Sequence, residues 1–144
     1  VRYDTMQWVF WQMAGLGPMA GQTHHFRNYA QEKIPYAIER YVNETNRLYG
    51  VLNKRLKDRE YIAGEYSIAD MVSYPWVVPY KNQGQEIDDF PHLKRWVELV
   101  AARPGTQRAY AKAKEVNPNY GQPGIRTEAE RKLLFGQTAK VVKD

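Results

Sequence analysis

The sequence has 144 residues, a length typical of one domain with a buried core, and 43% of them are hydrophobic, which excludes a chain disordered by composition. The formal charge of +5 comes from 21 basic and 16 acidic residues scattered along the chain, which argues against a nucleic-acid-binding stripe and favours small anions as partners. The sequence contains no run of about 18 apolar residues, so it predicts no membrane-spanning helix. Cysteine is absent, which excludes disulfides, thiolate metal sites and a protein thiol nucleophile, and fits a cytoplasmic protein.

The first segment predicts a long, irregular helix. Hydrophobic residues recur at helical spacing over residues 2–14. The sequence Gly-Leu-Gly-Pro-Met-Ala-Gly at 15–21 then interrupts the pattern, since Pro18 cannot continue a helix but suits the first turn of a new one. We therefore expect a break or sharp bend, with the helix resuming near Met19 and running to about residue 31.

The glycines of this segment superficially match a phosphate-binding loop. The Lys-Ser/Thr ending and a preceding strand are both missing, so interruption of the helix is the simpler explanation. A bend in a long helix still opens a cleft beside it. The candidate cleft residues are Trp11, Gln12, Gly17, Pro18 and Tyr36, and the alternative for each is an ordinary surface or core position.

Residues 35–57 have the clearest helical periodicity in the chain. The apolar stripe consists of Ile34, Ile38, Tyr41, Leu48, Leu52 and Leu56, with Thr45 completing it. Arg40 lies on another face, one turn before Glu44. Two interpretations of Arg40 stay open: an i,i+4 pair with Glu44, or an anion clamp that holds a carboxylate through two parallel hydrogen bonds.

Ser67 and Asp70 form a Ser-x-x-Asp pattern just ahead of an apolar run. This spacing predicts a capping box, in which Ser67 caps the helix and Asp70 accepts from the backbone N–H of Ser67. Residues 67–80 are apolar nearly all round, which predicts a buried central helix that Pro75 kinks. We assign Ser67 and Asp70 structural roles.

The remaining segments are helical as well. Helices are expected over residues 91–103 and 104–116, followed by a loop at 117–124. Thr127 and Glu130 offer a second capping box before a short C-terminal helix. With no strand pattern, the fold class is all-α: one helical domain over residues 1–116, and a loop and short helix over 117–144 that pack on it.

The histidines and acids form no recognisable reactive set. His24 and His25 are neighbours, so on a helix they point about 100° apart and cannot grip one metal ion together. No ligand set, Ser-His-Asp triad or carboxylate pair is indicated by spacing, and no metal site is expected.

Four strings of residues carry a family resemblance. They are Gln-Trp-Val-Phe-Trp-Gln at 7–12, Gly-Leu-Gly-Pro-Met at 15–19, Ile-Pro-Tyr-Ala-Ile-Glu-Arg-Tyr at 34–41 and Tyr-Ser-Ile-Ala-Asp-Met at 66–71. Together with other matches they run in order over about residues 5–110. The chain thereby resembles the C-terminal helical domain of glutathione transferases, most closely the bacterial Nu-class group of disulfide-bond oxidoreductases.

The resemblance implies a set of expectations about partners. Arg40 reaches across a homodimer to a glutathione carboxylate, and the first helix with its Gly-Pro bend faces the partner subunit and the glutathione sulfur. Glutathione or glutathione disulfide is a substrate, with a small electrophile or disulfide as the second one and no further cofactor. A thioredoxin-like domain is expected before residue 1, in keeping with a start at Val1 that has neither an initiator methionine nor signal-peptide anatomy.

Two functions of different classes therefore compete. The first is a glutathione-dependent transferase or disulfide-bond reductase, in which this chain supplies the second-substrate cleft and the dimer interface and is inactive alone. The second is a non-catalytic interaction module of the same fold. The presence of Arg40 and the Gly-Pro bend favours the enzyme, because a scaffold needs neither.

Overall fold

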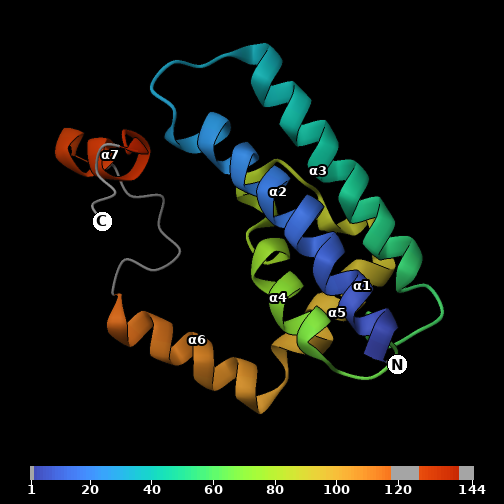
Figure 1. Ribbon diagram of the computed structural model, residues 1–144. Helices are drawn as coiled ribbons and strands as arrows, with labels where there is room; N and C mark the ends of the chain where they lie inside the picture. The colour runs from blue at the N-terminus through green and yellow to red at the C-terminus, as the bar shows by residue number, and fades with distance from the viewer. Residues whose placement is uncertain (1, 118–126, 140–144) are drawn as a thin grey trace.

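The computed structural model describes residues 2–117 and 127–139, and Figure 1 shows their arrangement. The helices are α1 (Arg2–Trp11), α2 (Gly17–His24), α3 (Pro35–Arg55), α4 (Ile68–Val77), α5 (Pro91–Ala101), α6 (Pro104–Val116) and α7 (Glu128–Phe135). Two π-helical turns cover Gln12–Leu16 and His25–Tyr29, and two 3₁₀ turns cover Tyr80–Gln83 and Ile87–Asp89. Between residues 2 and 117 and in 127–139 no strand forms, apart from isolated bridges in the turn at 61–65. The predicted all-α class is confirmed.

We expected a break or a sharp bend at 15–21; the first helical run is continuous from Arg2 to Tyr29, so a break is wrong. The irregularity is a π-helical turn over Gln12–Leu16, where the N–H of Gly17 bonds to the carbonyl of Gln12. An α-helical Pro18 ring would clash with the carbonyl four residues earlier, and a wider turn relieves that contact. Pro18 thus sits in the first turn of α2, and the run ends at Tyr29 because Ala30 is extended.

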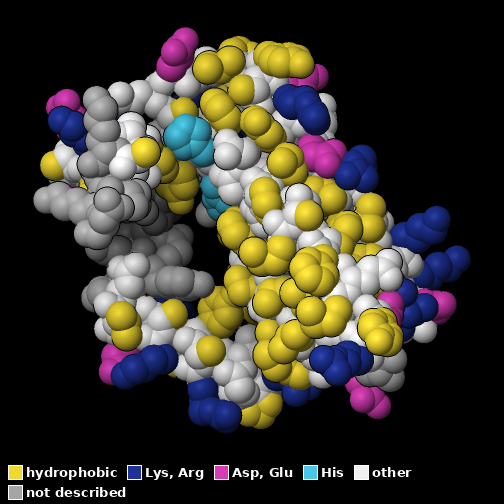
Figure 2. Space-filling view, in the orientation of Figure 1, with side chains coloured by type: hydrophobic (Ala, Val, Ile, Leu, Met, Phe, Trp, Pro, Cys, Tyr) yellow, Lys and Arg dark blue, Asp and Glu magenta, His cyan; other side chains and the backbone are white. Residues whose placement is uncertain are grey.

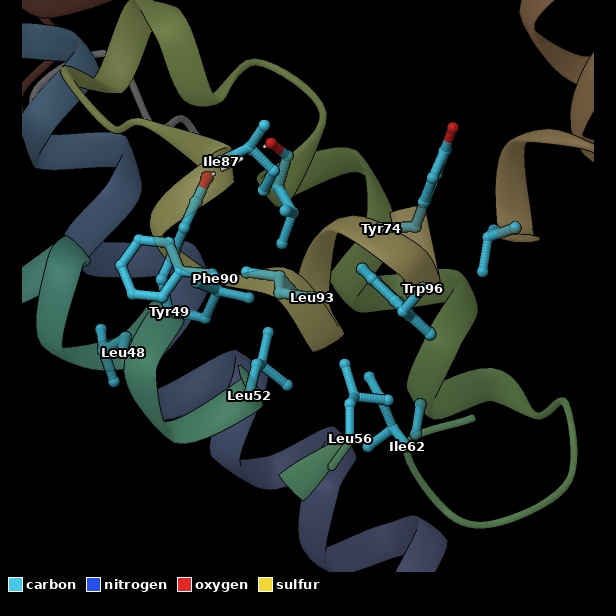
Figure 3. Close-up of a cluster of buried hydrophobic side chains, with 14 residues drawn as sticks. Leu48, Tyr49, Leu52, Leu56, Ile62, Tyr74, Ile87, Phe90, Leu93 and Trp96 are labelled. Carbon is cyan, nitrogen blue, oxygen red and sulfur yellow. Dashed lines mark hydrogen bonds between the residues drawn. The ribbon is translucent and has the colours of Figure 1, made fainter. Parts of the chain in front are cut away.

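The core lies between α3, α4 and α5. Leu48, Tyr49, Leu52 and Leu56 of α3 are buried, as the periodicity predicts. Figure 3 shows these side chains facing Leu93 and Trp96 of α5, with Tyr74 of α4 on the other side of Trp96. The stripe is not buried along its whole length, because Ile34 at the N-terminal end of α3 is exposed.

The predicted capping box at the start of α4 is present. Ser67 Oγ accepts from the backbone N–H of Ala69 at 3.2 Å, and Asp70 Oδ2 accepts from the N–H of Ser67 at 3.0 Å. Asp70 is also fully buried, and its Oδ1 accepts from the N–H of Ile62 at 3.0 Å and from Trp96 Nε1 at 2.8 Å. One carboxylate therefore ties the turn before α4 and helix α5 to the start of α4.

The last described helices follow the predicted order. α5 and α6 both begin on prolines, at Pro91 and Pro104, where the missing N–H costs little. The second capping box forms between Thr127 and Glu130 at the start of α7. The predicted loop at 117–124 lies almost wholly outside the described residues, and the division of the chain at 116 stays a prediction.

Candidate functional site

A cleft of about 360 Å³ opens at the junction of the first π-helical turn, α2 and α4. It is lined by Gln12, Met13, Gly17, Pro18, Gly21, Gln22 and Trp76. Three of the five sequence-predicted cleft residues, namely Gln12, Gly17 and Pro18, thus meet in one place. We call this the Gln12–Trp76 cleft. A π-helical turn inside a helix is frequently found at a functional site, and this one carries Gln12 at its start.

Gln12 is the unusual side chain of this cleft. It is only 2% exposed, yet its Oε1 has no hydrogen-bond partner among the described residues. Buried polar atoms in native structures are nearly always paired, because an unpaired one loses its hydration without compensation. The buried, unpaired oxygen of a residue that lines a cleft therefore marks this turn as a candidate functional segment.

Of the two glycines beside Trp76, only Gly17 is needed for the close approach of Trp76 and Gln12. A Cβ added at Gly17 would lie 2.9 Å from Gln12 Nε2 and 3.2 Å from Trp76 Nε1, closer than real Cβ atoms allow without movement. A Cβ at Gly21 would meet the far side of the Trp76 ring at 3.7 Å, an ordinary contact. Gly17 is therefore the glycine that the site requires, and the Gly-rich string serves close packing of α2 on α4.

A second cleft of about 360 Å³ adjoins the first and shares Gly21 and Trp76 with it. Its other lining residues are His24, Tyr29, Pro75 and Pro79. Phe135 of α7 stacks on Tyr29 with ring centroids 6.0 Å apart and meets His25 edge-on at 4.9 Å. The C-terminal helix therefore lies against the same end of the first helical run.

His24 belongs to a buried hydrogen-bond network that sequence reasoning missed. Gln83 Nε2 lies 3.2 Å from His24 Nε2 and donates to the carbonyl of Trp76, while Tyr49 donates to Gln83 Oε1 at 2.7 Å. Burial lowers the pKa of His24 and raises that of Tyr49. Neutral forms of both therefore hold α2, α3 and the turn after α4 together.

Arg40 and Tyr36 lie one turn apart at the N-terminal end of α3, and both are exposed. Of the two interpretations of Arg40, the pair with Glu44 does not form, since Glu44 binds Arg47 through two hydrogen bonds of 2.8 Å. That contact chiefly lowers the pKa of Glu44, and Arg40 adds a smaller coulombic contribution. In the part of the chain that the structure describes, Arg40 has no ion pair or hydrogen bond, and Tyr36 lines neither cleft.

Trp11, the remaining candidate, packs edge-on against Trp8 with ring centroids 5.1 Å apart and lines neither cleft. The neighbouring face of α1 is apolar and open. It presents Tyr3, Met6 and Phe10, of which Tyr3 is 90% and Phe10 66% exposed, and Met13 of the π-helical turn continues it. Figure 2 shows hydrophobic side chains as an almost continuous band over α1 and α2.

Two further features, a metal site and a membrane-spanning helix, were searched for in the described residues. Over 2–117 and 127–139, no group of three or more His, Asp or Glu side chains is placed to hold a metal ion. No helix in the same ranges has both the length and the apolar character that crossing a membrane requires.

Comparison with known proteins adds family information. Residues 19–104 match the family described as "Glutathione S-transferase, C-terminal domain". Disulfide-bond oxidoreductase YfcG of Escherichia coli is 51% identical over 113 residues, which cover 78% of this chain and 53% of that protein. Disulfide-bond oxidoreductase YghU of the same organism is 38% identical over 115 residues, covering 74% of this chain and 40% of that protein.

Solved structures agree with these relatives. A glutathione transferase family member from Pseudomonas fluorescens, with two glutathione bound, superposes with a TM-score of 0.68 at 43% identity, over 74% of this chain and 51% of that one. A glutathione transferase from Phanerochaete chrysosporium, in complex with oxidized glutathione, gives a TM-score of 0.74 at 33% identity, over 80% and 55% of the two chains. The chain spans about half the length of the curated relatives it matches.

Proposed function

Because the chain belongs to the glutathione S-transferase C-terminal domain family, we propose that it supplies the second-substrate cleft of a glutathione-dependent enzyme, with disulfide-bond reduction favoured over conjugation. The observation that carries this proposal is the Gln12–Trp76 cleft, with its buried and unpaired Gln12 amide. The names of the relatives support the reductase, since two of them are disulfide-bond oxidoreductases. The glutathione thiol is then held by a thioredoxin-like domain outside this chain, so activity requires both.

We further propose a homodimer that buries the open apolar face of α1. Tyr3 and Phe10 are among the most exposed large hydrophobic side chains described, and an apolar face of this kind is typical of an interaction surface. Arg40 suits a role at such an interface. Its guanidinium lacks an anionic partner among the described residues, so it is available for the carboxylate of a glutathione held by the partner subunit.

The test is Arg40→Ala in the full-length protein, with Arg47→Ala as a matched exposed arginine on the same helix. Loss of a charge-assisted carboxylate contact is expected to lower kcat/KM for glutathione by about 10- to 100-fold. Arg47→Ala should stay within about twofold, because its partner Glu44 lies on the same helix surface. Steady-state kinetics with glutathione as the varied substrate measure both, and melting temperatures show that neither variant is unfolded.

Equal kcat/KM values for Arg40→Ala and Arg47→Ala would show that Arg40 does not bind the glutathione carboxylate. A full-length wild-type protein without any glutathione-dependent turnover would instead favour the non-catalytic interaction module.

A further inference from the structure

We propose that His24, Asn28 and Gln83 form a proton-sensitive latch, which holds the end of α4 against α2 while the His24 ring is neutral and releases it in acid. The latch is a conformational device of this chain: it goes beyond the proposed function and needs no substrate. Its release changes the two clefts and leaves the hydrophobic core folded. The three side chains come from α2, the second π-helical turn and the turn after α4, so they join segments far apart in the sequence.

Both ring nitrogens of His24 face the amide nitrogen of another side chain. Gln83 Nε2 lies 3.2 Å from His24 Nε2, and Asn28 Nδ2 lies 3.4 Å from His24 Nδ1. The NH₂ group of Gln83 also donates to the carbonyl of Trp76 at 2.6 Å, and that of Asn28 donates to the carbonyl of Asn82 at 3.0 Å. Carbonyl oxygens only accept, so neither amide can turn its own oxygen toward His24 without losing that bond. The ring therefore lies between two hydrogen-bond donors.

The two donors admit a neutral ring and oppose a protonated one. Neutral imidazole has one nitrogen that accepts a hydrogen bond, whereas imidazolium donates at both nitrogens. Protonation of His24 therefore removes the only acceptor of the ring and sets N–H groups against the NH₂ groups on both sides. Burial of His24 acts in the same direction and lowers its pKa. Acid is thus expected to drive the ring out of the latch.

Burial is the only cause that shifts the pKa of His24, so in the described chain no carboxylate compensates for the charge of a protonated ring. Tyr29 stacks on the His24 ring, with centroids 6.3 Å apart, and Tyr49 of α3 reaches it through Gln83. The other titratable or charged groups at this end of α2 and on the elements packed against it are His25, Arg27, Tyr41, Glu44, Tyr80 and Lys81. The one acid among them, Glu44, is bound by Arg47.

The latch reaches both clefts through Trp76. His24 and Trp76 line the second cleft together, and the Trp76 ring also lines the Gln12–Trp76 cleft. Gln83, which is fully buried, holds the Trp76 carbonyl at the end of α4. A His24 ring that leaves Gln83 ends the contact between this amide and α2 and removes one wall of the second cleft. Acid therefore changes the shape of both clefts without any ligand.

The experiment is a pH titration, from about pH 8 to about pH 5, of the ligand-free full-length protein labelled with ¹⁵N-tryptophan. The indole N–H signal of Trp76 reports on the latch. That of Trp96, which is bonded to the buried Asp70 carboxylate at 2.8 Å, reports on the core. Melting temperatures at the start of the titration show whether each variant is folded.

Three variants separate the latch from other titrating groups. His24→Gln keeps a polar side chain that does not titrate, and His25→Gln is the same substitution at the next residue. Asn28→Asp replaces one donor of the latch, at an exposed position, by a carboxylate that accepts from a protonated ring. It keeps the test decisive where His24→Gln does not fold.

In wild type the Trp76 signal is expected to move with a midpoint below pH 6.5, while the Trp96 signal stays in place. His24→Gln should abolish the movement, and His25→Gln should retain it. Asn28→Asp should raise the midpoint by about one pH unit, because an acceptor of opposite charge then faces the ring.

A Trp76 signal that does not move, or that moves equally in wild type and His24→Gln, would overturn the latch. A Trp96 signal that moves with the same midpoint would overturn it too, since the whole domain then unfolds in acid. An unchanged midpoint in Asn28→Asp would also contradict it. No ligand and no turnover enter these measurements, so their outcome is separate from that of the proposed function.

Discussion

Asp70 and Gln12 are both buried polar side chains, yet the two regions around them differ in kind. Asp70, at the start of α4, accepts hydrogen bonds from Ile62, Ser67 and Trp96 and joins three segments of the core. Gln12, in the first π-helical turn, has an oxygen with no partner in the described chain and lies on a cleft. A polar group satisfied by its own chain stabilises the fold, whereas a buried one without a partner costs stability and marks its segment as a candidate site.

The largest effect that this comparison predicts is on stability at Asp70. Asp70→Ala leaves the N–H groups of Ile62 and Ser67 and the indole N–H of Trp96 without their acceptor, each in or near the core. The free energy of unfolding should fall by about 3 kcal/mol or more. Urea denaturation measures it, with the exposed Asp58→Ala as control. A loss below about 1 kcal/mol would show that the carboxylate does not hold these segments together.

A smaller effect on stability is expected from alanine substitutions at Gly17 and Gly50. The methyl group of Gly17→Ala would lie 2.9 Å from Gln12 Nε2 and 3.2 Å from Trp76 Nε1, so these side chains must shift, whereas that of Gly50→Ala in α3 meets no atom within 4 Å. Filling a closely packed position costs about 1–3 kcal/mol, while an open helical glycine gains up to about 1 kcal/mol on change to alanine. Gly17→Ala should therefore be less stable than Gly50→Ala in the same denaturation assay. The reverse order would mean that the cleft wall adapts freely and Gly17 is not required.

The smallest effect concerns pH. Burial lowers the pKa of His24 in the folded state, while the unfolded chain keeps an ordinary value of about 6.5. Well above pH 6.5, His24 is unprotonated in both the folded and the unfolded state, so its protonation takes nothing from the free energy of unfolding. As pH falls through 6.5 the unfolded state takes up the proton first, and stability decreases until pH passes the folded pKa. The pH dependence of unfolding should become shallower in His24→Asn and persist in His92→Asn; equal slopes would contradict this role of His24.

Much of the fold follows from local sequence patterns. Helical periodicity places α3, the Ser67–Asp70 box begins α4, and prolines begin α5 and α6, because each of these signals acts within a few residues. The features that the sequence did not predict depend on contacts between residues far apart in the chain. The Gly-Pro string remains helical, as the end of the π-helical turn and the start of α2, and Gly17 and Gly21 of α2 lie against Trp76, which is far along the chain.

In the candidate site, too, local sequence patterns predict some features and long-range contacts determine the others. Spacing on a helix allows Glu44 to pair with Arg40 or with Arg47, and side-chain geometry selects Arg47. The network of His24 depends on Gln83, 59 residues away, which no local pattern signals. Gln12, Gly17 and Pro18 could be nominated from one irregular helix, but the missing partner of Gln12 becomes visible only when α4 is packed against it.

The central claim is that the Gln12–Trp76 cleft binds the second substrate, and the indole N–H signals of the four tryptophans test it directly. In full-length protein labelled with ¹⁵N-tryptophan, glutathione disulfide is titrated and each indole N–H resonance is followed. The account predicts that the Trp76 signal moves, while that of Trp96, bonded to Asp70, stays in place. A titration that leaves Trp76 unchanged while the ligand binds elsewhere would contradict the claim.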